Sequence, residues 1–152
     1  MKEYLLLYKS PYNHYYPIKN NAISGLFNLN EFFFSDYRYY NSIFLNQDQI
    51  HGEETIVIND QEHKFLYIFT KDHDPDEHIP DDDLPGLTNE FNSCKISYDN
   101  FIKFREKWIQ LTKHLPPFII IYRDHNNWIF CKGFDSKEDM ELFVDDNTQT
   151  VH

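Results

Sequence analysis

The chain has 152 residues, of which 41% are apolar and 18% aromatic, and its formal net charge at pH 7 is −11. This composition supplies enough apolar surface for a folded core and excludes a wholly disordered chain. The negative charge argues against nucleic acid and against an anionic membrane surface as partners, because both are bound through basic residues. A cationic protein is the natural electrostatic complement.

The start of the chain and its cysteines indicate a cytoplasmic protein. The apolar stretch Tyr4–Tyr8 is too short for the hydrophobic region of a secretory signal, and no apolar run reaches the roughly 18 residues of a membrane span. Cys94 and Cys131 are too few for a disulfide framework or a zinc site. We therefore expect reduced thiols and no cofactor.

The first predicted element is a short buried strand over Tyr4–Tyr8. The segment "SPYNHYYP" follows, and its two prolines predict a loop from Pro11 to Pro17. Three tyrosines in this loop are candidates for contact with a partner: Tyr12, Tyr15 and Tyr16.

The next segments are aromatic and β-branched. Residues 22–29 are compatible with a short helix or turn around Gly25. Residues 31–45 have an ambiguous period, and we favour a strand in their second half. Residues 54–70 contain two β-branched and aromatic runs on either side of Asp60-Gln61, which predicts a hairpin.

An acidic loop is predicted from residue 71 to about residue 92. Its prolines and its glycine oppose regular structure there: Pro75, Pro80, Pro85 and Gly86. Residues 70–100 contain two Lys or Arg against nine Asp or Glu, so a fifth of the chain holds most of the excess negative charge. Solubility alone would not require that clustering.

The last part of the chain predicts a helix, a hairpin and a second helix. Residues 97–115 place five apolar side chains on one helical face: Phe101, Phe104, Trp108, Leu111 and Leu115. Residues 118–134 predict a hairpin, and residues 136–146 a short helix capped by Ser136. Strands and helices in this order predict a single α+β domain over residues 1–152 with a mainly antiparallel sheet.

Metal binding is one interpretation of the acidic run. Asp72, Asp74, Asp76 and Asp83 occupy positions 1, 3, 5 and 12 of an EF-hand count. The glycine that this loop needs at position 6 is replaced by Glu77, and prolines stiffen the segment. His73 and His78 could ligate a transition metal, but no helix presents them on one face. Adventitious cation binding is the better interpretation.

Catalysis is a second interpretation. The chain has eight histidines, and a histidine pair could cleave RNA by acid–base chemistry. An enzyme with this net charge would repel such a polyanionic substrate. The sequence also lacks G-x-S-x-G, Walker A and H-E-x-x-H motifs, and its four glycines are isolated. We therefore predict a protein that is not an enzyme.

Protein binding is the interpretation that we favour. A cluster of carboxylates accelerates encounter with a basic protein but contributes little affinity by itself, so exposed aromatic residues are needed as well. The predicted contact residues in the acidic run are Asp72, Asp74, Asp76, Glu77, Asp81, Asp82 and Asp83. The aromatic candidates are Tyr12, Tyr15 and Tyr16, with a second group at Tyr37, Tyr39 and Tyr40.

In its size, its charge, the run "DHDPDEHIPDDD" and its Tyr-rich loops, the chain resembles the immunity proteins of bacterial polymorphic toxin systems, including contact-dependent growth inhibition. These proteins share no single fold, so the resemblance implies a function only. It implies an inhibitor that covers the cleft of a basic toxin domain, with a nuclease as the expected toxin and carboxylates in place of substrate phosphates. A nucleic-acid mimic that antagonises a host DNA-binding protein stays open as an alternative.

Overall fold

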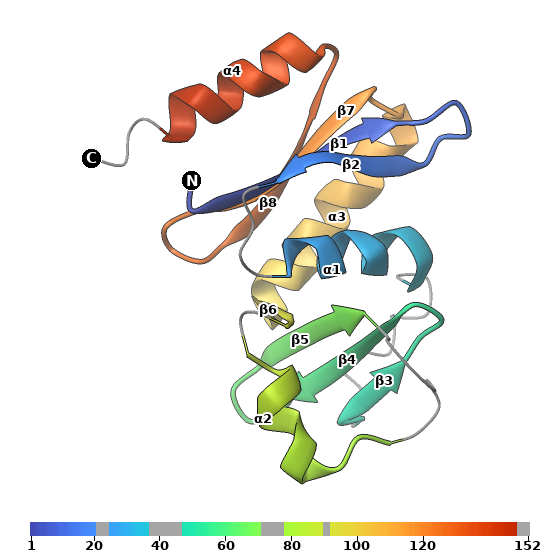
Figure 1. Ribbon diagram of the computed structural model, residues 1–152, viewed down its shortest axis with the longest axis vertical. Helices are drawn as coiled ribbons and strands as arrows, with labels where there is room; N and C mark the ends of the chain where they lie inside the picture. The colour runs from blue at the N-terminus through green and yellow to red at the C-terminus, as the bar shows by residue number, and fades with distance from the viewer. Residues whose placement is uncertain (21–24, 37–46, 71–77, 90–91, 149–152) are drawn as a thin grey trace. The chain divides into compact units, whose positions relative to one another are not determined.

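The structure is a computed structural model that describes residues 1–20, 25–36, 47–70, 78–89 and 92–148 (Figure 1). The chain divides into two compact units. Unit 1 comprises Met1–Ala22 and Asp99–His152, and unit 2 comprises Ile23–Tyr98. Each unit contains an antiparallel sheet and helices, which confirms the predicted α+β class. The prediction of one domain over the whole chain stays a prediction.

Unit 1 is built on a sheet with the strand order β2-β1-β7-β8. The bounds of these strands are Glu3–Lys9 for β1, Tyr15–Asn20 for β2, Phe118–Arg123 for β7 and Ile129–Phe134 for β8. Alternate residues of β1 point to opposite faces, and both faces are buried: Leu5 and Leu7 on one, Tyr4 and Leu6 on the other. Each face of this sheet is therefore covered.

Helix α3 (Tyr98–His114) covers the face that carries Leu5 and Leu7. It buries Phe101, Phe104 and Trp108, and the Trp108 ring meets Tyr15 of β2 edge-on at 6.1 Å between centroids. The predicted helix is confirmed over Tyr98–His114, but Leu115, predicted on the same helical face, lies past the end of the helix with a positive φ of 47°.

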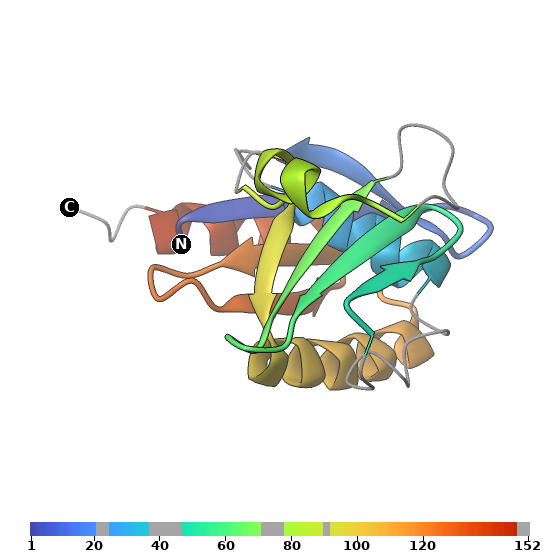
Figure 2. The ribbon, with the colours of Figure 1, turned by 90° about the horizontal axis from the view of Figure 1, so that it is seen from below.

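Helix α4 (Lys137–Thr148) covers the opposite face of the unit 1 sheet (Figures 1 and 2). Met140 and Val144 pack there with Tyr4, Leu6 and Ile120. The backbone N–H of Asp139 donates to the Ser136 hydroxyl at 3.1 Å, so the predicted cap and the predicted C-terminal helix are confirmed.

Unit 2 contains a second sheet, with the strand order β3-β4-β5-β6. The strands are β3 (Gln49–His51), β4 (Thr55–Asp60), β5 (Phe65–Thr70) and β6 (Cys94–Ser97). Helix α1 (Leu26–Glu31), followed by a π-helical turn over Phe32–Asp36, lies on one face, where the Thr70 hydroxyl donates to the Asn28 side chain at 2.6 Å. The other face packs Ile56, Ile58 and Phe69 against Ile79, Leu84 and Leu87.

Both predicted hairpins are confirmed. Strands β4 and β5 pair from Thr55–Thr70 to Asp60–Phe65, and β7 and β8 pair from Phe118–Phe134 to Arg123–Ile129. The predicted strand in the second half of 31–45 lies outside the described residues.

Two predicted loops are partly wrong. Strand β2 begins at Tyr15, inside the predicted loop, because β2 is at the sheet edge and an edge strand tolerates Pro17, which has no N–H to donate. Within the predicted acidic loop, Asp81–Asp83 form a 3₁₀ turn that continues into helix α2 (Leu84–Leu87). Pro85 is tolerated because it lies in the first turn, where the backbone N–H has no helical partner.

Candidate functional site: an acidic pocket in unit 2

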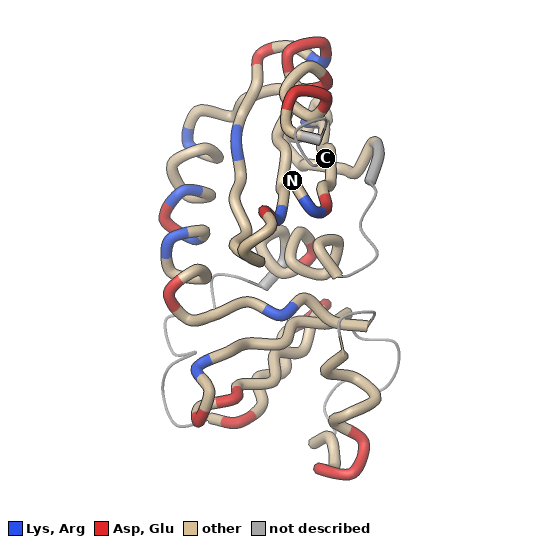
Figure 3. The backbone as a smooth tube through the Cα atoms, turned by 90° about the vertical axis from the view of Figure 1, so that its left-hand side faces the viewer, with Lys and Arg blue, Asp and Glu red and all other residues tan. Residues whose placement is uncertain are grey.

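The formal charge of the chain falls entirely within unit 2. Unit 2 contains fifteen Asp or Glu and four Lys or Arg, whereas unit 1 contains ten of each. Figure 3 shows basic and acidic positions interleaved along α3 of unit 1. Unit 1 is therefore neutral overall, and unit 2, with a net charge of −11, is the part of the chain that would attract a cation.

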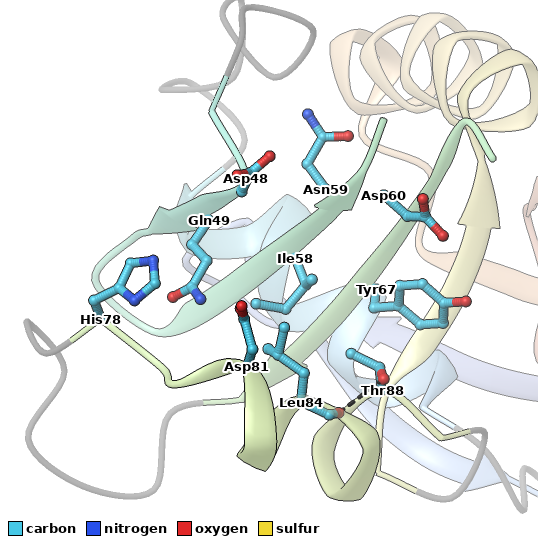
Figure 4. Close-up of a pocket in the computed structure, with 10 residues that line it drawn as sticks. All are labelled: Asp48, Gln49, Ile58, Asn59, Asp60, Tyr67, His78, Asp81, Leu84 and Thr88. Atoms are coloured by element: carbon cyan, nitrogen blue, oxygen red, sulfur yellow. Dashed lines mark hydrogen bonds between the residues drawn. The ribbon is translucent and has the colours of Figure 1, made fainter. Parts of the chain in front are cut away.

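A pocket of about 500 Å³ lies between the unit 2 sheet and the segment that contains the Asp81–Asp83 turn (Figure 4). That volume is in the range of about 300–1,000 Å³ typical of ligand sites. Its lining residues are Asp48, Gln49, Ile58, Asn59, Asp60, Tyr67, His78, Asp81, Leu84 and Thr88. Three of these are carboxylates, and no described Lys or Arg lines the pocket.

The outer wall of the pocket is fastened to edge strand β3 by one side chain. The Gln49 amide donates to the Ile79 carbonyl oxygen at 2.7 Å and accepts from the Ile79 N–H at 2.9 Å. The Gln49 side chain thus pairs with both backbone groups of Ile79, as a residue of a neighbouring strand would, and fixes the position of the backbone next to His78. At the other end of the wall, the Thr88 hydroxyl donates to the Leu84 carbonyl oxygen at 2.8 Å and closes α2. These hydrogen bonds hold both ends of this wall of the pocket.

The three carboxylates of the pocket differ in their hydrogen bonding. Asp48 accepts from the Gln61 amide at 2.8 Å. Asp60 accepts from both the backbone N–H and the ring of His63, the latter at 2.9 Å. Burial raises the pKa of Asp60, but the hydrogen bonds and the charge of His63 outweigh it and lower that pKa overall. Asp81 has no side-chain hydrogen bond or ion pair with a residue that the structure describes.

Of the three acidic residues in the turn, only Asp81 lines the pocket. A 3₁₀ turn has about three residues per turn, so consecutive side chains point in directions about 120° apart. Asp81 points toward the sheet and lines the pocket (Figure 4), while Asp82 and Asp83 are exposed and are not lining residues. The other predicted acidic contacts lie outside the described residues: Asp72, Asp74, Asp76 and Glu77.

The predicted aromatic contacts belong to unit 1. Tyr12 lies in the turn between β1 and β2 and is 83% exposed, and Tyr16 of β2 is 44% exposed. The turn is held by the Ser10 hydroxyl, which accepts from the backbone N–H groups of Tyr12 and His14 at 3.3 Å. Tyr8 lies opposite Tyr16 with 6.0 Å between the ring centroids, and is also exposed.

Tyr15 is a correction to the predicted contact set. It is only 5% exposed, and its hydroxyl donates to the Pro116 carbonyl oxygen at 2.7 Å. Because Tyr15 and Tyr16 are adjacent on a strand, their side chains point to opposite faces, and Tyr15 fills the core beneath α3. It therefore packs within unit 1. Tyr37, Tyr39 and Tyr40 lie outside the described residues.

Sequence reasoning missed the pocket residues that come from the sheet, namely Asp48, Gln49, Asp60 and Tyr67. The alternation of Ile56, Ile58 and Asp60 along β4 was the one available signal, because it places a carboxylate in line with two apolar side chains. The side chain of Gln49 gave no signal, since its partner Ile79 is thirty positions away in the sequence.

Among the described residues, no three His, Cys, Asp or Glu side chains are grouped as a metal site would require. Within the same residues, no helix has the length and apolar character to cross a membrane. The chain has no match among protein-family models, curated proteins or solved structures.

Proposed function

We propose that the protein is an immunity or inhibitor protein that binds a basic toxin domain, a nuclease, and covers its cleft in the cytoplasm. The observation that carries this proposal is the confinement of the whole formal charge of −11 to unit 2. A nuclease domain is basic because its substrate is a polyanion, so an acidic inhibitor is its electrostatic complement.

The described residues supply two features that such an inhibitor needs. Asp81, Asp82 and Asp83 form an exposed acidic turn in unit 2, which would accelerate encounter with a basic surface. Tyr12 and Tyr16 in unit 1 are exposed, and tyrosine joins a large rigid face to a hydroxyl, which suits a partly hydrated interface. The carboxylates supply the rate of association, and the tyrosines supply affinity.

The arrangement of the acidic turn favours an inhibitor that covers the cleft of the toxin over one that imitates a nucleic acid. A mimic needs carboxylates in a regular row, as phosphates are spaced along a strand. The three side chains of a 3₁₀ turn point away from one another instead. We therefore assign the carboxylates to steering and to local contacts with basic side chains of the partner.

The test begins with capture of a partner from native lysate on the immobilised protein and elution in rising salt. We expect a basic protein, with an isoelectric point above about 9, that is released only at high salt. The second step measures nucleic-acid cleavage by that protein as the inhibitor is added. Cleavage that stops at equimolar inhibitor supports the proposal. Undiminished cleavage, or a partner without nuclease activity, would overturn it.

A further inference from the structure

We propose that the unit 2 pocket receives the side chain of one arginine of the partner protein. This inference rests on the proposed function and names the chemistry of one contact within it. It starts from the lining of the pocket, which combines apolar side chains, an aromatic ring, three carboxylates and His78, with no lysine or arginine among the described lining residues. An arginine side chain is complementary to each of these features.

The apolar part of the pocket matches the aliphatic stem of arginine. Ile58 of β4 and Leu84 of α2 pack in one apolar cluster of unit 2, and both side chains line the pocket (Figure 4). Three methylene groups placed against these two side chains would be removed from water, which favours binding. A small hydrated cation would not use these contacts.

The aromatic and acidic parts match the guanidinium group. Asp81 projects toward the sheet without a described hydrogen-bond partner, so it can accept a pair of guanidinium N–H groups. The Tyr67 ring lines the same pocket and offers a face for planar stacking. The Lys95 ammonium lies on the same sheet face, 4.4 Å from the Phe65 ring centroid and 5.8 Å from that of Tyr67, so the guanidinium has to stack on the part of the Tyr67 ring farther from Lys95.

The other two carboxylates of the pocket, Asp48 and Asp60, already have hydrogen-bond partners and do not compete with Asp81 for the guanidinium group. Asp48 accepts from the neutral Gln61 amide and so adds negative potential at the pocket, Asp60 is paired with His63, and Asp81 keeps its acceptor sites among the described residues. The Gln49–Ile79 hydrogen bonds fix the wall that leads into the turn, so little ordering is required when the side chain enters.

The experiment measures binding of small probes to the isolated protein by NMR of the Ile58, Leu84 and Thr88 methyl groups. The probe is arginine with an acetylated amino group and a methylamide carboxyl group, which represents a side chain in a peptide. Its control is the citrulline counterpart, which has nearly the same shape and no charge. We expect saturable shifts for the arginine probe with a Kd of roughly 1 mM, and at least fivefold weaker binding of the citrulline probe.

A matched pair of variants separates a pocket contact from bulk charge. Asp81→Asn and Asp82→Asn remove the same charge from adjacent positions of one exposed turn. We expect Asp81→Asn to weaken the arginine probe at least fivefold and Asp82→Asn less than twofold. Equal effects of the two variants, or equal binding of arginine and citrulline probes, would overturn the inference.

A third arm distinguishes a partner side chain from a free small cation. Free arginine and spermidine are titrated under the same conditions. Comparable or weaker binding than that of the capped arginine supports a side-chain pocket, and binding a hundredfold tighter would assign the pocket to a metabolite instead. Because no toxin is present in these titrations, their failure leaves the capture and inhibition test intact, and failure of that test leaves the probe result intact.

Discussion

Units 1 and 2 each place four described antiparallel strands between helical segments, yet unit 1 balances ten acidic with ten basic residues and unit 2 has fifteen against four. Both also fasten an edge strand with a side-chain amide that bonds both backbone groups of a distant residue. In unit 1 Asn100 bonds Ile129 at 2.8 and 2.7 Å, and in unit 2 Gln49 bonds Ile79. Similar layouts with such different charge indicate that the fold does not require the acidic excess.

The use of charge differs as well. In unit 1 a buried ion pair joins Glu3 of β1 to Arg123 of β7 at 2.6 Å. In unit 2 the carboxylates of Asp81, Asp82 and Asp83 are exposed. The buried pair in unit 1 thus contributes to internal structure, and the exposed carboxylates of Asp81, Asp82 and Asp83 in unit 2 are available to a partner. The following variants test that contrast.

The largest effects are expected from the two cores. Trp108→Ala in unit 1 should lower the free energy of unfolding by about 3–5 kcal/mol, and Leu66→Ala in unit 2 by about 2–5 kcal/mol, because both side chains are buried. Calorimetry also tests the predicted single domain. One transition that both substitutions shift would support it, and two transitions that respond separately would contradict it.

The buried ion pair of unit 1 comes next. Arg123→Met leaves the Glu3 carboxylate buried without its cation, and removes the bond to the Asn127 carbonyl oxygen, so we expect a loss of about 3–5 kcal/mol in urea unfolding. Glu3→Leu combined with Arg123→Met should recover most of it. The control is Lys137→Met, which breaks an exposed pair with Glu141 and should cost about 0–1 kcal/mol. Equal losses for both single variants would contradict the structural role.

The acidic turn is tested by the rate of association with the captured partner. Converting Asp81, Asp82 and Asp83 to Asn should lower the association rate constant about tenfold at low salt and flatten its salt dependence, with little change in stability. The control variant removes three exposed acids from unit 1: Glu106→Gln, Asp135→Asn and Asp146→Asn. Stopped-flow measurements that give the same reduction for both variants would show that only total charge matters.

The smallest effect is expected at Tyr15. Tyr15→Phe removes the hydrogen bond to Pro116 and should cost about 0.5–1.5 kcal/mol. Burial raises the pKa of Tyr15 to about 12, so its contribution is complete below about pH 10 and is lost as the pH rises toward 12. Tyr15→Phe should therefore reduce the alkaline loss of stability, and Tyr12→Phe, at an 83% exposed position, should not. Equal alkaline profiles for the two variants would contradict this assignment.

Local sequence patterns were sufficient to predict elements whose structure depends on the residues of one continuous segment. The 3.6-residue spacing of Phe101, Phe104 and Trp108 predicted α3, and the paired apolar runs on either side of Asp60 predicted the β4–β5 hairpin. Local patterns failed to predict elements whose structure depends on pairing with residues far away in the sequence. Strand β6 (Cys94–Ser97) pairs with β5 across the acidic run, and no property of those few residues indicates it.

The sequence by itself determined the α+β class, the long helix, both hairpins and the concentration of negative charge, because periodicity and charge are properties of neighbouring residues. The tertiary structure decided that Tyr15 is buried while Tyr16 is exposed, and that Asp81 lines a pocket while Asp82 does not. In both cases the residue types are identical and adjacent. Their difference arises from the direction of each side chain relative to a sheet, which is fixed only by strand pairing and by packing between distant segments.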